Sequence, residues 1–94
     1  DGLITVPETF ALYQNYPNPF NPTTTVKFSV EMKSIASLHI YDIKGRLVET
    51  LVSSKLAPGI HSVEWDASDA ATGVYIYRLT TPGFVESRKL IVLK

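Results

Sequence analysis

The sequence predicts an all-β protein in which two antiparallel sheets pack face to face as a sandwich. Short runs rich in β-branched and aromatic residues recur along its 94 residues, and Pro, Gly, Asn and Asp separate these runs. No segment has the capped period of a helix, and the Ala-rich stretch 67–71 is long enough for a single turn only. About seven strands at this spacing are typical of an immunoglobulin-like sandwich with less than about a tenth helix.

Apolar residues alternate with polar ones in several of these runs, which separates a core face from a solvent face. In chain order we expect strands over residues 10–13, 24–30, 37–41, 47–52, 60–65, 74–80 and 84–93. Alternation assigns to the core the side chains of Val26, Phe28, Val30, Leu38, Ile40, Val63 and Trp65. The run 74–80 and the terminal stretch 90–93 carry apolar residues on both faces, so we expect both to be covered on both sides and 74–80 to be central.

Two segments between strands predict tight, rigid connections. Residues 43–46 (IKGR) join two strands as a hairpin in which Gly45 takes a positive φ without steric cost. Residues 15–22 (NYPNPFNP) contain three prolines, which fix φ and remove backbone donors, so they are expected to form a rigid loop across or beside the sheets. We expect Tyr16 and Phe20 to pin that loop to the sandwich edge.

The length allows one domain, because single cores usually extend to roughly 100–150 residues before a chain splits. Residues 1–9 lean polar and contain Gly2 and Pro7, so we interpret them as a linker from an upstream catalytic or adhesive domain. Residues 10–94 then form the sandwich, which we expect to be a monomer.

Composition argues against several classes of function. Nine Lys and Arg balance nine Asp and Glu, so no net charge attracts nucleic acid or an anionic membrane surface. Cysteine is absent, which excludes disulfides, thiolate metal sites and a cysteine nucleophile but leaves the cellular compartment open. No apolar run approaches the roughly 20 residues that a membrane-spanning helix requires.

The residues that could carry chemistry form no recognisable site. His39 and His61 lack the spacing of metal ligands. Asp42, Asp66 and Asp69 lie near turns. Such carboxylates can bind Ca²⁺, but they more commonly accept hydrogen bonds from backbone N–H groups of the turn. No G-x-S-x-G elbow or glycine-rich phosphate loop is present. We therefore expect no catalytic, cofactor-binding or metal-binding residues and no enzymatic activity in this fragment.

Aromatic residues leave a second class of function open. A carbohydrate-binding or cell-adhesion module of a secreted hydrolase needs a platform on which sugars stack. The candidates for such a platform are Tyr41, Trp65, Tyr75, Tyr77 and Phe84. Their alternating strand positions favour packing in the core instead.

Several short blocks occur in order along the chain: residues 10–24 (FALYQNYPNPFNPTT), 38–46 (LHIYDIKGR), 65–66 (WD), 73–79 (GVYIYRL) and 89–94 (KLIVLK). Together they resemble the type A C-terminal sorting domain of the type IX secretion system. The immunoglobulin-like domain of flagellar hook-capping proteins shares the Y-D-x-x-G-R and G-x-Y features. The resemblance marks as sorting-motif candidates Tyr16, Pro17, Asn18, Pro19, Gly45, Arg46, Gly73, Tyr75, Lys89 and Lys94.

The resemblance implies a non-catalytic module that directs a larger secreted protein. Its partners would be the outer-membrane translocon of the type IX system, which recognises the folded domain after export, and a sortase-like peptidase that cuts near the start of the domain. The parent, commonly a protease, a glycoside hydrolase or an adhesin, would then be released or attached to surface lipopolysaccharide. The resemblance thus implies a protein secreted by, or held on the surface of, a Gram-negative bacterium.

Overall fold

The computed structural model describes residues 9–94, so residues 1–8 of the expected linker lie outside the described residues. Seven strands follow one another: β1 (Ala11–Leu12), β2 (Thr23–Val30), β3 (Ser34–Asp42), β4 (Leu47–Leu56), β5 (Gly59–Asp66), β6 (Gly73–Thr81) and β7 (Phe84–Val92). All seven expected strands are present. The expected bounds were too short for β3 and β4, because these two strands pair from the hairpin turn out to Ser34 and Leu56.

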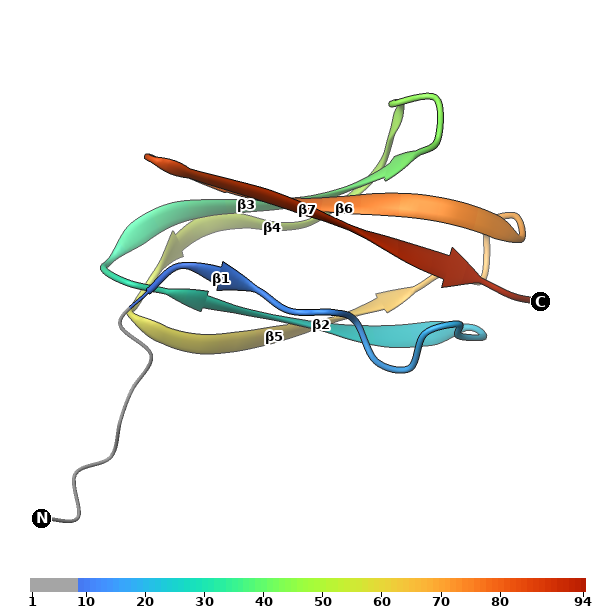
Figure 1. Ribbon diagram of the computed structural model, residues 1–94, viewed down its shortest axis with the longest axis horizontal. Helices are drawn as coiled ribbons and strands as arrows, with labels where there is room; N and C mark the ends of the chain where they lie inside the picture. Colours follow the sequence, from blue (N-terminus) through green and yellow to red (C-terminus); the bar gives the residue numbers. More distant parts are fainter. Residues whose placement is uncertain (1–8) are drawn as a thin grey trace, which may run out of the picture.

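The strands form two antiparallel sheets that pack face to face (Figure 1). One sheet has three strands in the order β1-β2-β5, and the other has four in the order β4-β3-β6-β7. This confirms the predicted all-β sandwich, and residues 9–94 contain no helix. The described chain therefore offers no helix that could cross a membrane. The described chain enters at one end of the sandwich and its C-terminus leaves at the other (Figure 1).

The core lies between the sheets and contains the side chains that alternation assigns to it. Those that are fully buried are Val26, Phe28, Val30, Leu38, Ile40 and Trp65. Val63 is half-buried at the margin of this cluster. The ring of Trp65 packs against the rings of Phe20 and Tyr75 at centroid distances of 5.8 and 5.6 Å. This aromatic cluster joins the two sheets to the segment that precedes β2.

The prediction that β6 and β7 are covered on both faces is wrong. β6 is central in its sheet as expected, but Val74 and Arg78 on its outward face are exposed. On β7, Leu90 and Val92 are buried whereas Ile91 is exposed. The sandwich has two layers, and nothing in the described part of the chain packs over the outward face of the four-stranded sheet. The aliphatic residues there therefore belong to the surface.

Candidate functional site

The segment between β1 and β2, residues 13–22, lies beside the edge of β7, and we call it the proline loop (Figure 1). Phe20 pairs in parallel with Val92. The Phe20 N–H donates to the Ile91 carbonyl, and the Leu93 N–H donates to the Phe20 carbonyl, both at 3.1 Å. The loop thus acts as a short extra strand next to the C-terminal strand.

Side chains of the proline loop extend this contact along β7. Gln14 Nε2 donates to the Lys89 carbonyl at 2.8 Å, and the Ile91 N–H donates to Asn18 Oδ1 at 3.0 Å. An edge strand normally leaves its outer backbone groups open to pairing with another chain. Here the loop occupies them over the last part of β7, so this edge is closed.

The proline loop is also bonded to the other sheet. Tyr16 and Thr25 exchange backbone hydrogen bonds, at 3.0 Å from the Tyr16 N–H and at 2.9 Å from the Thr25 N–H. The peptide bonds that precede Pro17, Pro19 and Pro22 are cis. The backbone of the loop is tied to β2 on one side and to β7 on the other, which supports the prediction of a rigid loop.

Asn15 is the buried centre of this arrangement, with 2% of its surface exposed. Its Nδ2 donates to the Pro17 carbonyl at 3.1 Å and to Thr24 Oγ1 at 2.9 Å. Its N–H donates to the Tyr77 hydroxyl at 2.9 Å, and that hydroxyl donates to the Tyr13 carbonyl at 2.8 Å. Burial raises the pKa of Tyr77, which keeps the hydroxyl protonated and able to donate. The buried polar groups of the loop, β2 and β6 therefore satisfy one another's hydrogen bonds in one network.

The prediction that Tyr16 pins the loop is wrong, whereas Phe20 does lie in the core. Tyr16 is 80% exposed. Its pairing partner Thr25 occupies an outward position of β2, and directly paired residues in antiparallel strands point to the same face. Asn15 supplies the second anchor in its place. Tyr16, Pro17, Asn18 and Pro19, four of the sorting-motif candidates, form a continuous exposed stretch of the loop.

Gly45 and Arg46 build the predicted hairpin turn between β3 and β4. Gly45 has a φ of 84°, a conformation that strongly favours glycine. Asp42 Oδ1 accepts the N–H groups of Lys44 and Arg46, each at 2.9 Å, and Asp42 Oδ2 accepts Arg46 Nε at 2.9 Å. The hydrogen bond from the Arg46 N–H is the main cause of the lowered pKa of Asp42. The Y-D-x-x-G-R block is therefore a self-contained turn.

Gly73 and Tyr75 both lie at the start of β6. Gly73 begins that strand, and the Tyr75 ring packs edge-on against Trp65 at 5.6 Å. The Tyr75 hydroxyl donates to the Ala71 carbonyl at 2.7 Å. Because Tyr75 is 8% exposed, it offers little surface to a partner, and its contacts give it a structural role.

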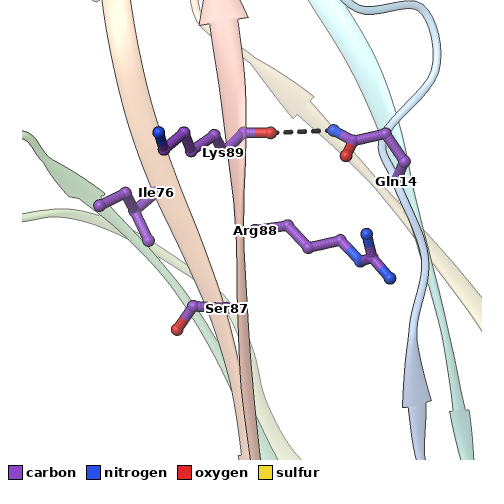
Figure 2. Close-up of a pocket in the computed structure, with 5 residues that line it drawn as sticks. All are labelled: Gln14, Ile76, Ser87, Arg88 and Lys89. Atoms are coloured by element: carbon purple, nitrogen blue, oxygen red, sulfur yellow. Dashed lines mark hydrogen bonds between the residues drawn. The ribbon is translucent and has the colours of Figure 1, made fainter.

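The two terminal lysines differ in their surroundings. Lys94 Nζ donates to the Ser68 carbonyl at 2.5 Å, and its N–H donates to Thr72 Oγ1 at 3.1 Å, which ties the chain end to the turn between β5 and β6. Lys89 lies opposite Ile76 in the strand register and extends from the outward face of β7 (Figure 2). Of the two, Lys89 is the one that faces away from the sandwich.

A hollow of about 460 Å³ surrounds this part of β7, lined by Gln14, Ile76, Ser87, Arg88 and Lys89 (Figure 2). Ile76, Ser87 and Lys89 lie on one side of the strand, and Arg88 extends toward the proline loop on the other. The two cations of the lining do not converge, because Lys89 and Arg88 point to opposite sides of the strand. Arg88 is also occupied, since it lies 3.3 Å from the Glu86 carboxylate and its Nε donates to the Leu12 carbonyl.

The other residues considered for chemistry take ordinary structural roles. His39 Nδ1 lies 3.0 Å from Thr50 Oγ1, and His61 Nε2 lies 2.7 Å from the Ala57 carbonyl oxygen. Asp66 shapes a turn, because it accepts both the hydroxyl and the N–H of Ser68, and the hydroxyl is the main cause of its lowered pKa. Among residues 9–94 no three metal-binding side chains come together.

The five aromatic residues do not share an exposed face. Three are buried in the core: Trp65, Tyr75 and Tyr77. The Arg78 guanidinium lies over the ring of Tyr41 at 5.2 Å, and Phe84 stacks on Phe10 at 5.4 Å. A sugar-stacking platform needs free ring faces side by side, and these residues do not provide one.

The residues that fasten the proline loop were missed from sequence. Besides Asn15 they include Gln14, which bonds the Lys89 carbonyl, and the Nε of Arg88 donates to the Leu12 carbonyl of β1, directly before the loop, at 2.7 Å. An Asn directly before a proline-rich segment does carry a signal, because its side chain commonly bonds nearby backbone. Gln14 and Arg88 bond partners that are 75 and 76 positions away, a distance at which local pattern gives no information.

These features define the class of protein. The chain is a two-layer β-sandwich in which a proline-containing loop is hydrogen-bonded along the edge of the C-terminal strand. A family model described as the secretion system C-terminal sorting domain matches residues 14–93. Since the match spans most of the chain, the chain belongs to this family, and the resemblance to type IX sorting domains is confirmed.

A solved structure has the same fold. It is that of PorZ, described as an essential bacterial surface component of the type-IX secretion system of Porphyromonas gingivalis. The TM-score is 0.64 at 24% sequence identity, over 88% of this chain and 11% of that chain. At this identity the similarity shows the fold, and the present chain spans only about a tenth of PorZ. No curated protein sequence matches this chain significantly.

Proposed function

We propose that residues 10–94 are a non-catalytic C-terminal address, which directs a larger secreted protein through the outer-membrane translocon of the type IX system. Membership of the sorting-domain family supports a role in secretion. The observation that carries the proposal is the pairing of Phe20 with Val92. This pairing joins the proline loop to the C-terminal strand at one edge of the sandwich, an arrangement that exists only in the folded domain. The resulting surface wraps around that edge: Tyr16 projects on the side of the three-stranded sheet and Lys89 on the side of the four-stranded sheet.

The exposed side chains of this surface are well placed for recognition. Tyr16 projects from a backbone that is hydrogen-bonded on both sides of the loop, so binding it would cost little conformational entropy. Lys89 lies on the same strand that the loop closes. We assign contact with the translocon to Tyr16, Pro17, Asn18, Pro19 and Lys89. Gly45, Arg46, Gly73, Tyr75 and Lys94 support that surface through the fold.

The same proposal covers the later steps. A sortase-like peptidase would cut within or near the linker 1–9, and the parent protein would be released or attached to lipopolysaccharide at the surface of a Gram-negative cell. The start of the described chain and the C-terminus lie at opposite ends of the sandwich (Figure 1). A peptidase at the linker and a translocon at the C-terminal strand could therefore both reach the domain.

The test is delivery of a reporter fused to residues 1–94 in a bacterium with a type IX system. Tyr16→Ser/Lys89→Ser removes an exposed aromatic residue and a cation from the proposed surface. Met32→Ser/Lys33→Ser is the matched control, because both residues are exposed and lie between β2 and β3. We expect similar melting temperatures for both doubles and a loss of surface delivery for the first only. Normal delivery of the first double, with its fold intact, would exclude this surface from recognition.

A further inference from the structure

We infer that the outward face of the four-stranded sheet is a second contact surface, and that it binds a protein surface on which carboxylates lie beside apolar side chains. The inference rests on the proposed function, because it names the chemistry of the partner that receives the domain. It concerns a face on which β3, β4, β6 and β7 all contribute side chains.

One end of this face is a continuous apolar patch. In the strand register Leu47 lies opposite Tyr41, and Tyr41 lies opposite Ile76. The next outward pair toward the C-terminus is Val74 and Ile91. Leu47, Val74 and Ile91 are all exposed. Single exposed apolar residues are ordinary on a protein surface, whereas a contiguous group with charged neighbours is typical of an interaction site.

Cations border the patch, and one of them is held in a fixed orientation. The Arg78 guanidinium lies 5.2 Å from the centroid of the Tyr41 ring, and Arg78 Nε donates to Ser87 Oγ at 3.0 Å. Arg78 is nevertheless exposed. A guanidinium that is already oriented loses less entropy when it binds a carboxylate through its remaining N–H groups. Lys89 lies opposite Ile76 and adds a second cation at the β7 side.

The acidic residues of these strands take inward positions in the strand register, although Asp42, at the hairpin end, still lies near Tyr41 and Arg78. In residues 34–92 the acidic residues of the four strands lie opposite inward-facing neighbours in the register: Asp42, Glu49 and Glu86. The outward positions carry Lys55, Arg78 and Lys89 and no carboxylate. The face is therefore cationic although the whole chain has no net charge, and the complementary partner is anionic.

The surroundings favour a protein partner over an anionic polysaccharide. Sugars stack on free aromatic faces, but Arg78 covers Tyr41, and the rest of the patch is aliphatic. Aliphatic contact beside oriented cations matches a protein interface, in which an apolar centre has charged neighbours. The partner would dock on the face rather than add a strand at β7, because the proline loop already occupies that edge.

The test uses the reporter fused to residues 1–94, with a charge arm and an apolar arm. Arg78→Ser is compared with Lys27→Ser, which removes an exposed cation from the outward face of the other sheet. Val74→Thr/Ile91→Thr is compared with Ile60→Thr, which makes the same kind of change at an exposed position of β5, in the other sheet. The melting temperature of each purified variant is measured. If Arg78→Ser melts lower than its control, Arg78→Gln, which keeps the stem over Tyr41, replaces it.

We expect surface delivery to fall roughly fivefold or more in both arms, as expected for loss of a binding contact, and to stay normal in both controls. Normal delivery in both arms, with the wild type delivered, would overturn this inference and leave the proposed function standing. Failure of the wild type itself would instead contradict the proposed function. A loss confined to Arg78→Ser, together with Arg78-dependent binding of polygalacturonate in calorimetry, would assign the face to an anionic polysaccharide and overturn the protein partner. An equal loss in the controls would also contradict the inference.

Discussion

Asn15→Ala tests how the proline loop is held, and its effect can be worked out from the hydrogen bonds of one side chain. The substitution removes the bonds from Nδ2 to the Pro17 carbonyl and to Thr24 Oγ1, and the bond that Oδ1 accepts from Gln14 Nε2. A net bond contributes about 0.5–1.5 kcal/mol, and a buried group left without a partner costs about 1–3 kcal/mol. The Thr24 hydroxyl still donates to the Pro17 carbonyl, which limits the loss. We expect Asn15→Ala to lower the free energy of unfolding by about 2–4 kcal/mol.

Tyr16→Ala, a substitution at the next residue of the same loop, is the control for Asn15→Ala. Tyr16 is 80% exposed and its hydrogen bonds are made by the backbone, so the free energy of unfolding should change by less than about 0.5 kcal/mol. Urea unfolding, followed by far-ultraviolet circular dichroism, measures both variants. Asn15→Asp removes both Nδ2 donors and buries a charge, so it should be at least as destabilising as Asn15→Ala. Equal stability of Asn15→Ala and wild type, or equal losses for Asn15→Ala and Tyr16→Ala, would refute this account of the loop.

Three further predictions concern the core, the hairpin and acid stability. Trp65→Ala should destabilise by about 3–5 kcal/mol in the same urea experiment, because it empties a buried aromatic site; a nearly unchanged stability with loss of glycan binding would instead mark Trp65 as a sugar platform. Gly45→Ala should cost about 1–2 kcal/mol, because a φ of 84° is strained for a residue with a Cβ, while surface delivery of a fused reporter stays normal; lost delivery in the folded variant would give the turn a direct role in recognition. The lowered pKa values of Asp42 and Asp66 mean that their stabilising effect is complete above the ordinary Asp pKa and is lost as pH falls through the lower folded values. The melting temperature of wild type should thus fall more steeply below about pH 4 than that of Asp42→Asn/Asp66→Asn, and parallel curves would contradict this.

Local sequence pattern was sufficient for the strands, the hairpin and most of the core. Val26, Phe28 and Val30 alternate with polar residues and are buried as a set, and Gly45 occupies the positive φ that its turn requires. The same reasoning failed for β6 and β7. β-branched and aliphatic residues suit any strand, so Val74 and Ile91 indicate β-structure without indicating that a second layer covers them.

The candidate site depended more strongly on contacts that local pattern does not contain. Tyr16 and Asn15 are neighbours, yet the polar one is buried and the aromatic one is exposed, because the pairing with Thr25 decides which side chain turns outward. The pairing of Phe20 with Val92 joins two segments that lie far apart in the sequence. The resemblance marked Gly45, Tyr75 and Lys89 as sorting-motif candidates alike. Only the three-dimensional arrangement shows that Gly45 and Tyr75 build the fold, whereas Lys89 faces outward.

The most direct test of the central claim is the location of a reporter fused to residues 1–94, compared between a strain with a type IX system and an isogenic strain that lacks its outer-membrane translocon. A reporter without the domain is the control for leakage. We expect the fusion at the cell surface or in the medium of the first strain, and folded in the periplasm of the second. Retention in the periplasm of both strains, or equal appearance outside both, would contradict the conclusion that this domain is an address for type IX secretion.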